Sequence, residues 1–300
     1  MRTDYDVVVI GAGIHGAGVA QAAAARGYRV LVLEKNTVAS GTSSKSSKLI
    51  HGGLRYLETG QFSLVRECLA ERAILLRNAP ELVTLKAFLI PVYKWSKRPS
   101  WKISLGLQLY AFLAGWKSHL RHQKIPRQDW QQLDGLDTEG LVAVYQYYDA
   151  QTDAALLTQS VLQSAQNFDT KLCCHANVSS ILLRPDGCEI EYQTKGKRLE
   201  SCTSICVVNA TGPWVSETVK KLSPQLTGPP IDLVQGSHIL INKTLVRGIY
   251  YVESRLDGRA IFVMPWYGKT LVGTTEKIYH EPPDKVRPLE SEIKSLIASY

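Results

Sequence analysis

A glycine-rich turn near the start of the chain constrains the fold more than any other feature. Residues 5–10 form an apolar run that opens into Gly11-Ala12-Gly13-Ile14-His15-Gly16, and an alanine-rich stretch then leads to a second apolar run at residues 30–33. Strand, glycine turn, helix and strand in this order are typical of a βαβ unit. The glycines allow a tight turn, let a pyrophosphate approach bare backbone at the helix N-terminus, and let the helix pack closely on the sheet.

An acidic residue completes this pattern. Glu34 lies at the end of the second expected strand, 18 residues after Gly16. A carboxylate at this position can accept hydrogen bonds from ribose hydroxyls, and it argues against the 2′-phosphate of NADP. The pattern therefore predicts a dinucleotide bound at Gly11, Gly13, Gly16 and Glu34, and by itself it leaves both FAD and NAD open.

The positive charge is concentrated in one segment. The formal net charge is +8, and the stretch from Leu82 to Gln128 contains nine Lys or Arg and no Asp or Glu. The basic residues are Lys86, Lys94, Lys97, Arg98, Lys102, Lys117, Arg121, Lys124 and Arg127. Such a block predicts a surface for an anionic partner, which is a phospholipid, a nucleic acid or a phosphate-bearing ligand.

Aromatic and apolar residues lie within this basic block. They are Trp95, Trp101 and Trp116, with Ile103, Leu107, Tyr110 and Ala114 at helical spacing. Apolar stripe, aromatic anchors and basic flanks predict a helix that lies in the plane of a membrane surface. A helix that packs on the protein's own core is the alternative, and it explains the stripe but not the missing acids. Nucleic acid is not expected, because no recognised nucleic-acid module is visible. The longest apolar stretch, residues 103–116, is too short to span a bilayer of about 30 Å.

The six cysteines do not suggest a metal site. They are scattered without a C-x-x-C pair or zinc-type histidine spacing. We expect reduced core thiols, no bound metal and a reducing compartment. The N-terminus shows no secretory signal pattern.

The rest of the chain reads as helices followed by strands. Residues 62–79 show helical periodicity ended by Pro80, and Asp153 can cap a helix that runs to residue 165. Strands are expected at residues 178–183 and 188–193, around the turn Pro185-Asp186-Gly187. Further strands fall between residues 205 and 274. Residues 289–300 begin an amphipathic helix without a C-cap, so we expect a fragment of a longer protein.

Longer motifs carry a family resemblance. The segment Gly41-Thr42-Ser43-Ser44-Lys45-Ser46-Ser47-Lys48-Leu49-Ile50-His51-Gly52-Gly53-Leu54-Arg55-Tyr56-Leu57-Glu58 resembles the flavin-contacting loop of the aerobic, membrane-associated, FAD-dependent glycerol-3-phosphate dehydrogenases. Asn209-Ala210-Thr211-Gly212-Pro213-Trp214 resembles their second flavin-binding turn. Gly236-Ser237-His238-Ile239, Pro265-Trp266 and Gly273-Thr274-Thr275 also match in order. The resemblance extends from Asp6 to Tyr300. The family's later segments would lie beyond residue 300.

The resemblance implies a fold and a division into domains. The fold is the α/β, glutathione-reductase-like FAD-binding fold of the D-amino-acid-oxidase type, with an interleaved antiparallel-sheet substrate domain. Residues 1–80 and 150–222 would form the FAD-binding domain, and 81–149 a basic, aromatic-rich cap or membrane-contact segment. Residues 223–300 would supply truncated substrate-domain strands.

The resemblance also implies a reaction. Noncovalent FAD would oxidise sn-glycerol 3-phosphate to dihydroxyacetone phosphate and pass electrons to a membrane quinone. The protein would be cytoplasmic and peripherally associated with the inner face of the cell membrane, on anionic phospholipid. The oligomeric state stays open, with a homodimer as one option. The alternatives are a flavin amine or amino-acid oxidase of the same fold, an RNA-modifying flavoprotein, and a catalytically incomplete flavin-binding fragment.

The expected site residues fall into two sets. The further cofactor contacts are Thr42, Ser43, Ser44, Ser47, Val178, Ala210 and Gly212. His51 is the expected base, with a structural histidine bonded to backbone as the alternative. Arg55 and Tyr56 are expected to hold the substrate phosphate, with a salt bridge from Arg55 to Glu58 as the alternative. His238 is a further candidate on the substrate side. Gln235 and Glu276 depart from the family, which often has Lys or Arg and usually Asp at these positions.

Overall fold

The chain forms two units, each discontinuous in sequence. A computed structural model describes residues 3–115 and 122–300. The first unit comprises the residues up to 46 together with 153–233 and 282–284. The second unit comprises residues 47–152, 234–281 and 285–300. The two units are therefore interleaved along the chain, as expected from the sequence.

The boundaries of these units differ from the expected ones at residues 80, 150 and 222. Residues 47–80 belong to the second unit, because β3 (Leu49–Ile50) pairs with β6 (Leu141–Thr152) and α2 (Phe62–Asn78) packs into that unit's core. The basic segment is not a separate cap. Its first strand, β4 (Val83–Tyr93), pairs with β6 along almost its whole length inside the second sheet.

The first unit is built on a seven-stranded sheet in the order β11-β8-β9-β10-β1-β2-β7. Its strands are β1 (Tyr5–Ile10), β2 (Val30–Glu34), β7 (Lys171–Cys174), β8 (Asn177–Arg184), β9 (Gly187–Gln193), β10 (Leu199–Asn209) and β11 (Leu222–Ser223). β10, β1, β2 and β7 are parallel, and β9 and β8 continue the sheet in antiparallel pairs. Parallel neighbours place the carboxyl ends of β1, β2 and β10 at one edge, where a ligand can bind.

Helices cover one face of the parallel strands. α1 (Ile14–Ala24) and α4 (Ala154–Gln166) pack there, and Ala17 and Ala20 meet Leu162 in a shared core. Small alanine side chains let α1 approach the sheet closely. α4 begins at Asp153, whose Oδ1 accepts from the backbone N–H of Ala155 at 2.9 Å, so the expected helix cap is confirmed. The short helix α5 (Val215–Val219) follows β10.

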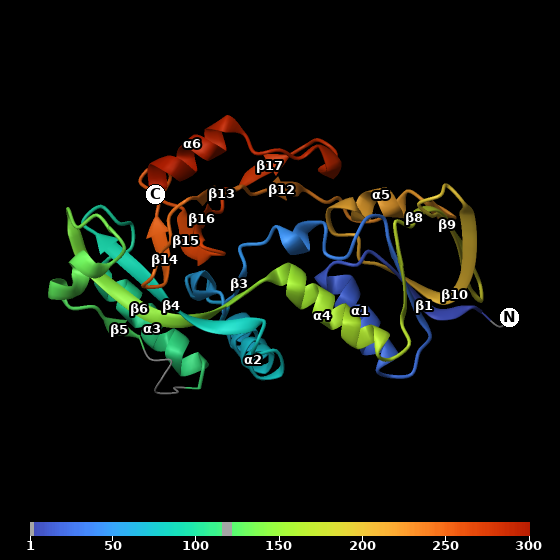
Figure 1. The fold of residues 1–300 in the computed structure, drawn as a ribbon, viewed down its shortest axis with the longest axis horizontal. Helices are drawn as coiled ribbons and strands as arrows, with labels where there is room; N and C mark the ends of the chain where they lie inside the picture. The colour runs from blue at the N-terminus through green and yellow to red at the C-terminus, as the bar shows by residue number, and fades with distance from the viewer. Residues whose placement is uncertain (1–2, 116–121) are drawn as a thin grey trace. The chain divides into compact units, whose positions relative to one another are not determined.

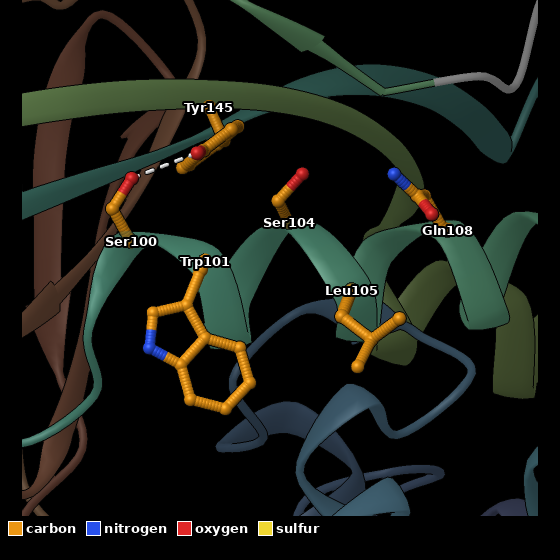
Figure 2. A pocket seen from close by; sticks show the side chains of 6 residues that line it. All are labelled: Ser100, Trp101, Ser104, Leu105, Gln108 and Tyr145. Carbon is orange, nitrogen blue, oxygen red and sulfur yellow. Dashed lines mark hydrogen bonds between the residues drawn. The ribbon is translucent and has the colours of Figure 1, made fainter.

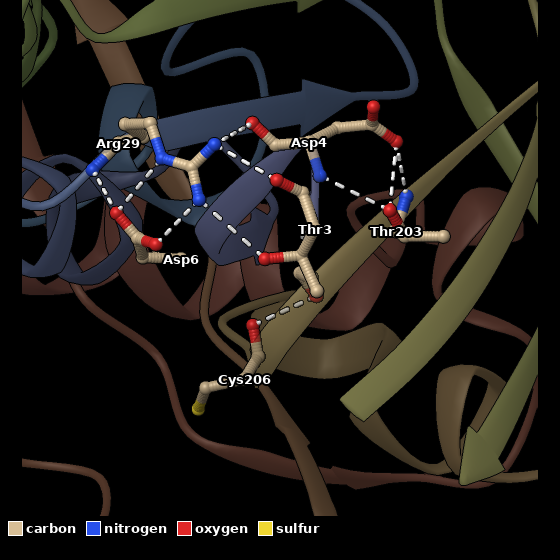
Figure 3. Close-up of polar contacts among 7 residues, drawn as sticks. Thr3, Asp4, Asp6, Arg29, Thr203 and Cys206 are labelled. Carbon is tan, nitrogen blue, oxygen red and sulfur yellow. Dashed lines mark hydrogen bonds and ion pairs between the residues drawn. The ribbon is translucent and has the colours of Figure 1, made fainter. Parts of the chain in front are cut away.

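Side-chain bonds tie the start of β1 to both neighbouring strands. The guanidinium of Arg29 pairs with Asp6 at 2.7 Å and donates to the carbonyl oxygen of Thr3 at 2.8 Å. The carboxylate of Asp4 accepts from the backbone N–H of Thr203 at 2.9 Å (Figure 3). These contacts fix the register of β1 at the end opposite the glycine turn.

The second unit contains an eight-stranded, mostly antiparallel sheet in the order β13-β16-β15-β14-β4-β6-β3, with β5 paired to β6. The strands not yet introduced are β5 (Gln123–Lys124), β13 (His238–Ile241), β14 (Ile249–Glu253), β15 (Ala260–Trp266) and β16 (Lys269–Gly273). β14 and β4 pair in parallel. A separate two-stranded pair joins β12 (Leu233–Gln235) and β17 (Lys277–Tyr279).

Alternation along β4 divides the core of this unit into two layers. Phe88 and Ile90 cluster with residues of α2 and α3 (Ser100–Leu113), whereas Leu89 clusters with Leu296 of α6 (Glu290–Ser299). Figure 1 shows α6 on one side of β4 and α2 on the other. Successive side chains on a strand point to opposite faces, so one central strand serves both layers.

Helix α3 has two apolar faces. The expected stripe, which includes Leu107 and Tyr110, is buried in the core, so core packing explains it and the membrane interpretation of the stripe is wrong. A second face carries Trp101, Leu105 and Phe112, whose exposed fractions are 67%, 57% and 65%. Trp101 and Leu105 project from the same side of the helix (Figure 2), and Phe112 follows seven residues later.

The polar side of α3 lies beside β6. Ser100 bonds to the hydroxyl of Tyr145 at 2.8 Å, in a shallow groove that Ser104 and Gln108 also line (Figure 2). Trp116, Lys117 and Arg121 of the basic block lie outside the described residues. Of the helices that the structure describes, none combines the length and apolar character needed to cross a bilayer.

Candidate functional site

The glycine turn joins β1 to α1 with backbone packed against backbone. Gly11 has φ +103°, and a Cβ at this position would lie 2.6 Å from the carbonyl oxygen of Ala210. Gly16 lies against the carbonyl of Gly11, with no room for a Cβ. Gly13 is the N-cap of α1 and offers no side chain to the free amides of the first turn. These amides, with the positive end of the helix dipole, form an anion-binding position.

The hydroxyl-rich loop reaches this helix end. Ser43 accepts a hydrogen bond through Oγ from the backbone N–H of Ile14 at 2.9 Å, and a Cβ on Gly13 would lie 3.2 Å from the same oxygen. Ser44 donates to the carbonyl of Gly41 at 3.0 Å, while Thr42 is exposed. Ser47 falls in the second unit.

Glu34 is buried at the end of β2 and holds the turn in place. Its Oε2 accepts from the N–H of Ala12 and its Oε1 from the N–H of Asn36, both at 2.8 Å. Each oxygen keeps a further lone pair for a ribose hydroxyl. The connection from β7 to β8 passes beside it, because the N–H of Ala176 donates to the Glu34 carbonyl at 2.8 Å. Val178 follows on β8, and its carbonyl accepts from Nζ of Lys221 at 2.6 Å, so that oxygen is already engaged.

The second turn closes the cradle from the side of β10. The N–H of Ala210 donates to the carbonyl of Ile10 at 2.9 Å, and Asn209 braces the turn through Thr211 and Val215. Gly212 has φ +56°, a conformation that glycine adopts without strain. We name the residues that meet at this sheet edge the cradle: Gly11, Gly13, Gly16, Ser43, Glu34 and Ala210.

The cradle fits a dinucleotide. Side chains are absent where a pyrophosphate needs to approach the first turn of α1, and hydroxyl groups lie beside that turn. The buried carboxylate of Glu34 lies at the end of β2, where a carboxylate can accept hydrogen bonds from ribose hydroxyls. Gly11, Gly13, Gly16 and Glu34 therefore provide space and hydrogen-bonding groups that fit a dinucleotide such as FAD.

In the second unit His51 is bonded to backbone. The N–H of Gly53 donates to Nδ1 of His51 at 3.0 Å, and the ring stacks on Phe262 with centroids 6.4 Å apart. The His51 side chain is partly open to solvent, but desolvation by the protein atoms around it lowers its pKa, and Asp149 partly offsets this effect. A nitrogen that accepts a hydrogen bond carries no proton, so the neutral ring holds its proton on Nε2. This geometry matches the alternative of a backbone-bonded histidine, and it makes Nε2 a donor.

Arg55 and Tyr56 lie next to each other on the turn Leu54–Leu57. The guanidinium of Arg55 stands 5.2 Å from the Tyr56 ring centroid and donates to its hydroxyl at 3.5 Å, a contact that raises the pKa of Arg55. The alternative bridge to Glu58 is not formed, because Glu58 binds Arg98 through two bonds of 2.6 and 2.8 Å. Arg55 is exposed and keeps donors available for a phosphate.

His238 lies on β13 opposite Gly273 of β16. Its Nε2 is buried and has no hydrogen-bond partner among the described residues. Burial, reinforced by the charge of Lys48, lowers the pKa of His238 to about 4. The ring is therefore neutral at pH 7 and has one unprotonated nitrogen.

Sequence reasoning did not select Lys48 as a functional residue. Its side chain is buried, and its Nζ lies 5.4 Å from the centroid of Trp266. The only signal was a lysine within the hydroxyl-rich loop, and that pattern does not indicate burial.

Strand register brings the two histidines to one face of the sheet. Phe262 pairs with Gly273, and Gly273 pairs with His238, so these residues form one row across three strands. Two strand spacings separate the ends of this row, which is about 10 Å. Because His51 stacks on Phe262, both histidines face the same patch. We name His51, Arg55, Tyr56, His238 and Lys48 the histidine cluster.

The two departures from the family have different surroundings. Nε2 of Gln235 donates to Oε2 of Glu292 at 2.6 Å and so ties β12 to α6. The backbone oxygen of Glu276 accepts from Arg259 at 3.0 Å. The side chain of Gln235 is therefore used in a hydrogen bond to the buried carboxylate of Glu292. Among the residues that the structure describes, no group of three or more His, Cys, Asp or Glu could hold a metal ion.

Comparisons with known proteins agree with this geometry. The model of the FAD dependent oxidoreductase family matches residues 6–300. A glycerol-3-phosphate dehydrogenase from Synechocystis is 40% identical over 99% of this chain and 56% of its own length. A D-erythritol 1-phosphate dehydrogenase from Brucella abortus is 36% identical over 98% of this chain and 59% of its own length. The chain thus spans little more than half the length of these relatives.

Solved structures show the same fold. The glycerol-3-phosphate dehydrogenase from Bacillus halodurans, solved in complex with FAD, has a TM-score of 0.77 at 26% identity and covers 98% of this chain and 52% of its own. A glycine oxidase from Geobacillus kaustophilus has a TM-score of 0.75 at 19% identity, covering 99% and 77% of the two chains, and shows the fold alone. These comparisons confirm the resemblance to glycerol-3-phosphate dehydrogenases, the D-amino-acid-oxidase type of fold, and FAD as the family's cofactor. The chain belongs to the FAD dependent oxidoreductase family.

Proposed function

We propose that the protein oxidises sn-glycerol 3-phosphate at C2 to dihydroxyacetone phosphate. The relatives that bear this dehydrogenase name support the substrate, and the histidine cluster supports the chemistry. The observation on which the proposal depends most is His238, a half-buried neutral histidine that lies in the same row as Phe262, on which His51 stacks.

Each residue has a defined task in this proposal. The cradle would hold FAD, which when bound would supply the acceptor for the hydride that leaves C2. Nε2 of His238 takes the proton of the C2 hydroxyl, and the C2–O single bond becomes the double bond of a ketone. Arg55 and Tyr56 hold the phosphate by charge-assisted hydrogen bonds. The sequence favoured His51 as the base, but a ring whose Nδ1 is occupied and whose Nε2 carries the proton donates instead.

Anaerobic bleaching of the flavin tests this proposal. Glycerol 3-phosphate should bleach the FAD-loaded protein, and His238→Gln should slow single-turnover bleaching by about 100-fold or more. Arg55→Ala should raise the KM by about 10- to 100-fold, the effect of losing one charge-assisted bond. Arg55→Lys keeps the positive charge but loses the two-pronged guanidinium, so its KM should lie between those of the wild type and Arg55→Ala.

Substrate range separates the alternatives. D-erythritol 1-phosphate deserves a parallel assay because of the Brucella relative. Bleaching by sarcosine or D-amino acids, without bleaching by glycerol 3-phosphate, would select an amine or amino-acid oxidase. FAD uptake without bleaching by any of these compounds would select the catalytically incomplete flavin-binding fragment.

We also propose that electrons pass from FAD to a membrane quinone at the inner face of the cell membrane, with the protein cytoplasmic and peripherally bound. The exposed Trp101, Leu105 and Phe112 support a lipid-facing role for α3, and the exposed Lys94 and Lys97 would attract anionic phospholipid. The test for the acceptor is reoxidation of the bleached flavin by a water-soluble quinone analogue under anaerobic conditions. Failure of reoxidation would remove the quinone from the proposal and leave the dehydrogenase step intact.

A further inference from the structure

A buried network connects α2 to the backbone beside His51. Arg72 of α2 pairs with Asp149 of β6 at 2.6 Å, and the exposed fractions of their side chains are 3% and 1%. The hydroxyl of Tyr110, on α3, donates to the other oxygen of Asp149 at 2.7 Å. The same hydroxyl accepts from the N–H of Gly52 at 2.7 Å. The next residue, Gly53, donates to Nδ1 of His51.

The direction of these bonds is fixed by charge. Asp149 sits beside a guanidinium and can accept but not donate. The hydroxyl of Tyr110 must therefore give its single proton to Asp149, which leaves its oxygen to accept from Gly52. Burial raises the pKa of Tyr110 well above its ordinary value, so the proton stays in place throughout the physiological range.

Close packing holds the same segment from the other side. A Cβ at Gly52 would lie 2.5 Å from Cδ2 of Leu69 and would also collide with the Tyr110 hydroxyl. Gly53 has φ +71°, which is the left-handed region. The backbone is thus pressed onto Tyr110 and Leu69 and then turns so that the Gly53 N–H points at the His51 ring.

We infer that Arg72, Asp149 and Tyr110 are positioning residues that hold the backbone of residues 51–53 and thereby lock His51 in its Nε2–H tautomer, as a hydrogen-bond donor to the substrate. The tautomer follows from the contacts of this chain alone. The donor role rests on the proposed function, since it presumes glycerol 3-phosphate as the substrate.

The tautomer is accessible to NMR of protein labelled with ¹⁵N in its histidines. The His51 ring signals are identified by their loss in His51→Gln. At neutral pH the wild type should show a protonated Nε2 and an unprotonated Nδ1 for His51. Tyr110→Phe removes one hydroxyl and should move the ring signals toward a mixture of the two tautomers.

Tyr147→Phe is the matched control. Tyr147 packs edge-on against Tyr110, with ring centroids 6.0 Å apart, and its hydroxyl takes no part in the bonds from Asp149 to Gly52. This variant should leave the His51 signals unchanged. A protonated Nδ1 in the wild type would overturn the inference, and so would unchanged His51 signals in Tyr110→Phe. The wild-type spectrum alone can refute the tautomer if Tyr110→Phe does not fold.

Kinetics test the donor role separately. Tyr110→Phe should slow flavin bleaching by glycerol 3-phosphate about tenfold, the effect of one lost hydrogen bond, with a smaller change in KM. His51→Gln should give a similar loss, and the double variant should lose little more than either alone, because both changes remove the same interaction. Fully additive losses would overturn the donor role. If the wild type does not bleach at all, the proposed function fails while the NMR result still decides the tautomer.

Discussion

The cradle and the histidine cluster are built from different parts of the chain. The cradle is made mainly of backbone. Its site is defined by the space at Gly11 and Gly16 and by the free amides at the start of α1. In the histidine cluster, side chains from two distant segments, residues 48–56 and His238, face one patch because strand register places His238 in the row of Phe262, on which His51 stacks. A site made of backbone depends on local spacing, whereas a site made of side chains depends on long-range pairing. The two should therefore respond differently to substitution.

The largest expected effect is on the cradle. Gly13→Val would place a branched side chain beside Ser43, where a Cβ alone already comes within 3.2 Å, and would fill the space of the pyrophosphate. We expect loss of all measurable FAD binding, read from flavin absorbance after addition of excess FAD. Gly18→Ala, on the same helix with nothing within 4 Å of the added Cβ, should keep FAD and stabilise by up to about 1 kcal/mol. FAD retention by Gly13→Val would mean that the backbone is not the binding element.

The next largest effect is on stability, through the buried pair of Arg72 and Asp149 that lies behind the backbone next to His51. Arg72→Met leaves the carboxylate of Asp149 buried without its cation, which should lower the free energy of unfolding by about 3–5 kcal/mol in urea titrations. Lys294→Gln removes an exposed pair with Glu290 on α6 and should change that free energy by less than about 0.5 kcal/mol. Similar values for the two variants would show that the buried pair does not anchor the second unit.

Protonation of His238 should give a smaller, pH-dependent effect. Its pKa is about 4 in the folded protein, against an ordinary value of 6.5. Between these values the unfolded state binds a proton that the folded state does not, so stability falls as the pH is lowered through this window. The contribution is about 3 kcal/mol when the full shift is counted. Urea titrations between pH 7 and about pH 4 should therefore show a shallower loss of stability in His238→Gln than in the wild type. Parallel curves would show that the pKa is not depressed.

Sequence patterns placed the local elements of the cradle correctly, because these elements depend on spacing along the chain. The turn Gly11 to Gly16, Glu34 and the cap at Asp153 are local, and each is where the pattern placed it. The unit boundaries were wrong because Leu49 pairs with Gln151, about one hundred residues away, and no local signal reports such a pairing.

Side-chain roles were harder to predict. Periodicity found an apolar stripe on α3 but could not say which of two apolar faces is buried, and the face with Leu107 is the core. The bond between Gly53 and His51 depends on a left-handed backbone, and the burial of Lys48 depends on distant strands. These features follow from tertiary contacts, which spacing along the chain does not report.

The smallest expected effect concerns binding of the exposed face of α3 and the nearby lysines to a lipid surface. Each basic residue near that surface should contribute about 1 kcal/mol. Trp101, Leu105 and Phe112 should insert into a lipid surface, so changing all three to Ser should remove the salt-resistant part of binding to phosphatidylglycerol vesicles in co-sedimentation. Lys94→Gln with Lys97→Gln should weaken only the salt-sensitive part. Arg98 and Lys102 are poorer choices, because Glu58 already pairs with both.

The matched control comes from the other unit. Leu199 and Ile205 on β10 are exposed to a similar degree, 62% and 60%, and lie outside the basic block. Changing both to Ser should leave vesicle binding unchanged. If the α3 variant sediments like the wild type, or if neither sediments, the exposed face of α3 does not bind lipid, and the basic block serves another anionic partner such as the substrate phosphate. If the β10 variant loses binding equally, exposed apolar area alone drives sedimentation and α3 has no special role.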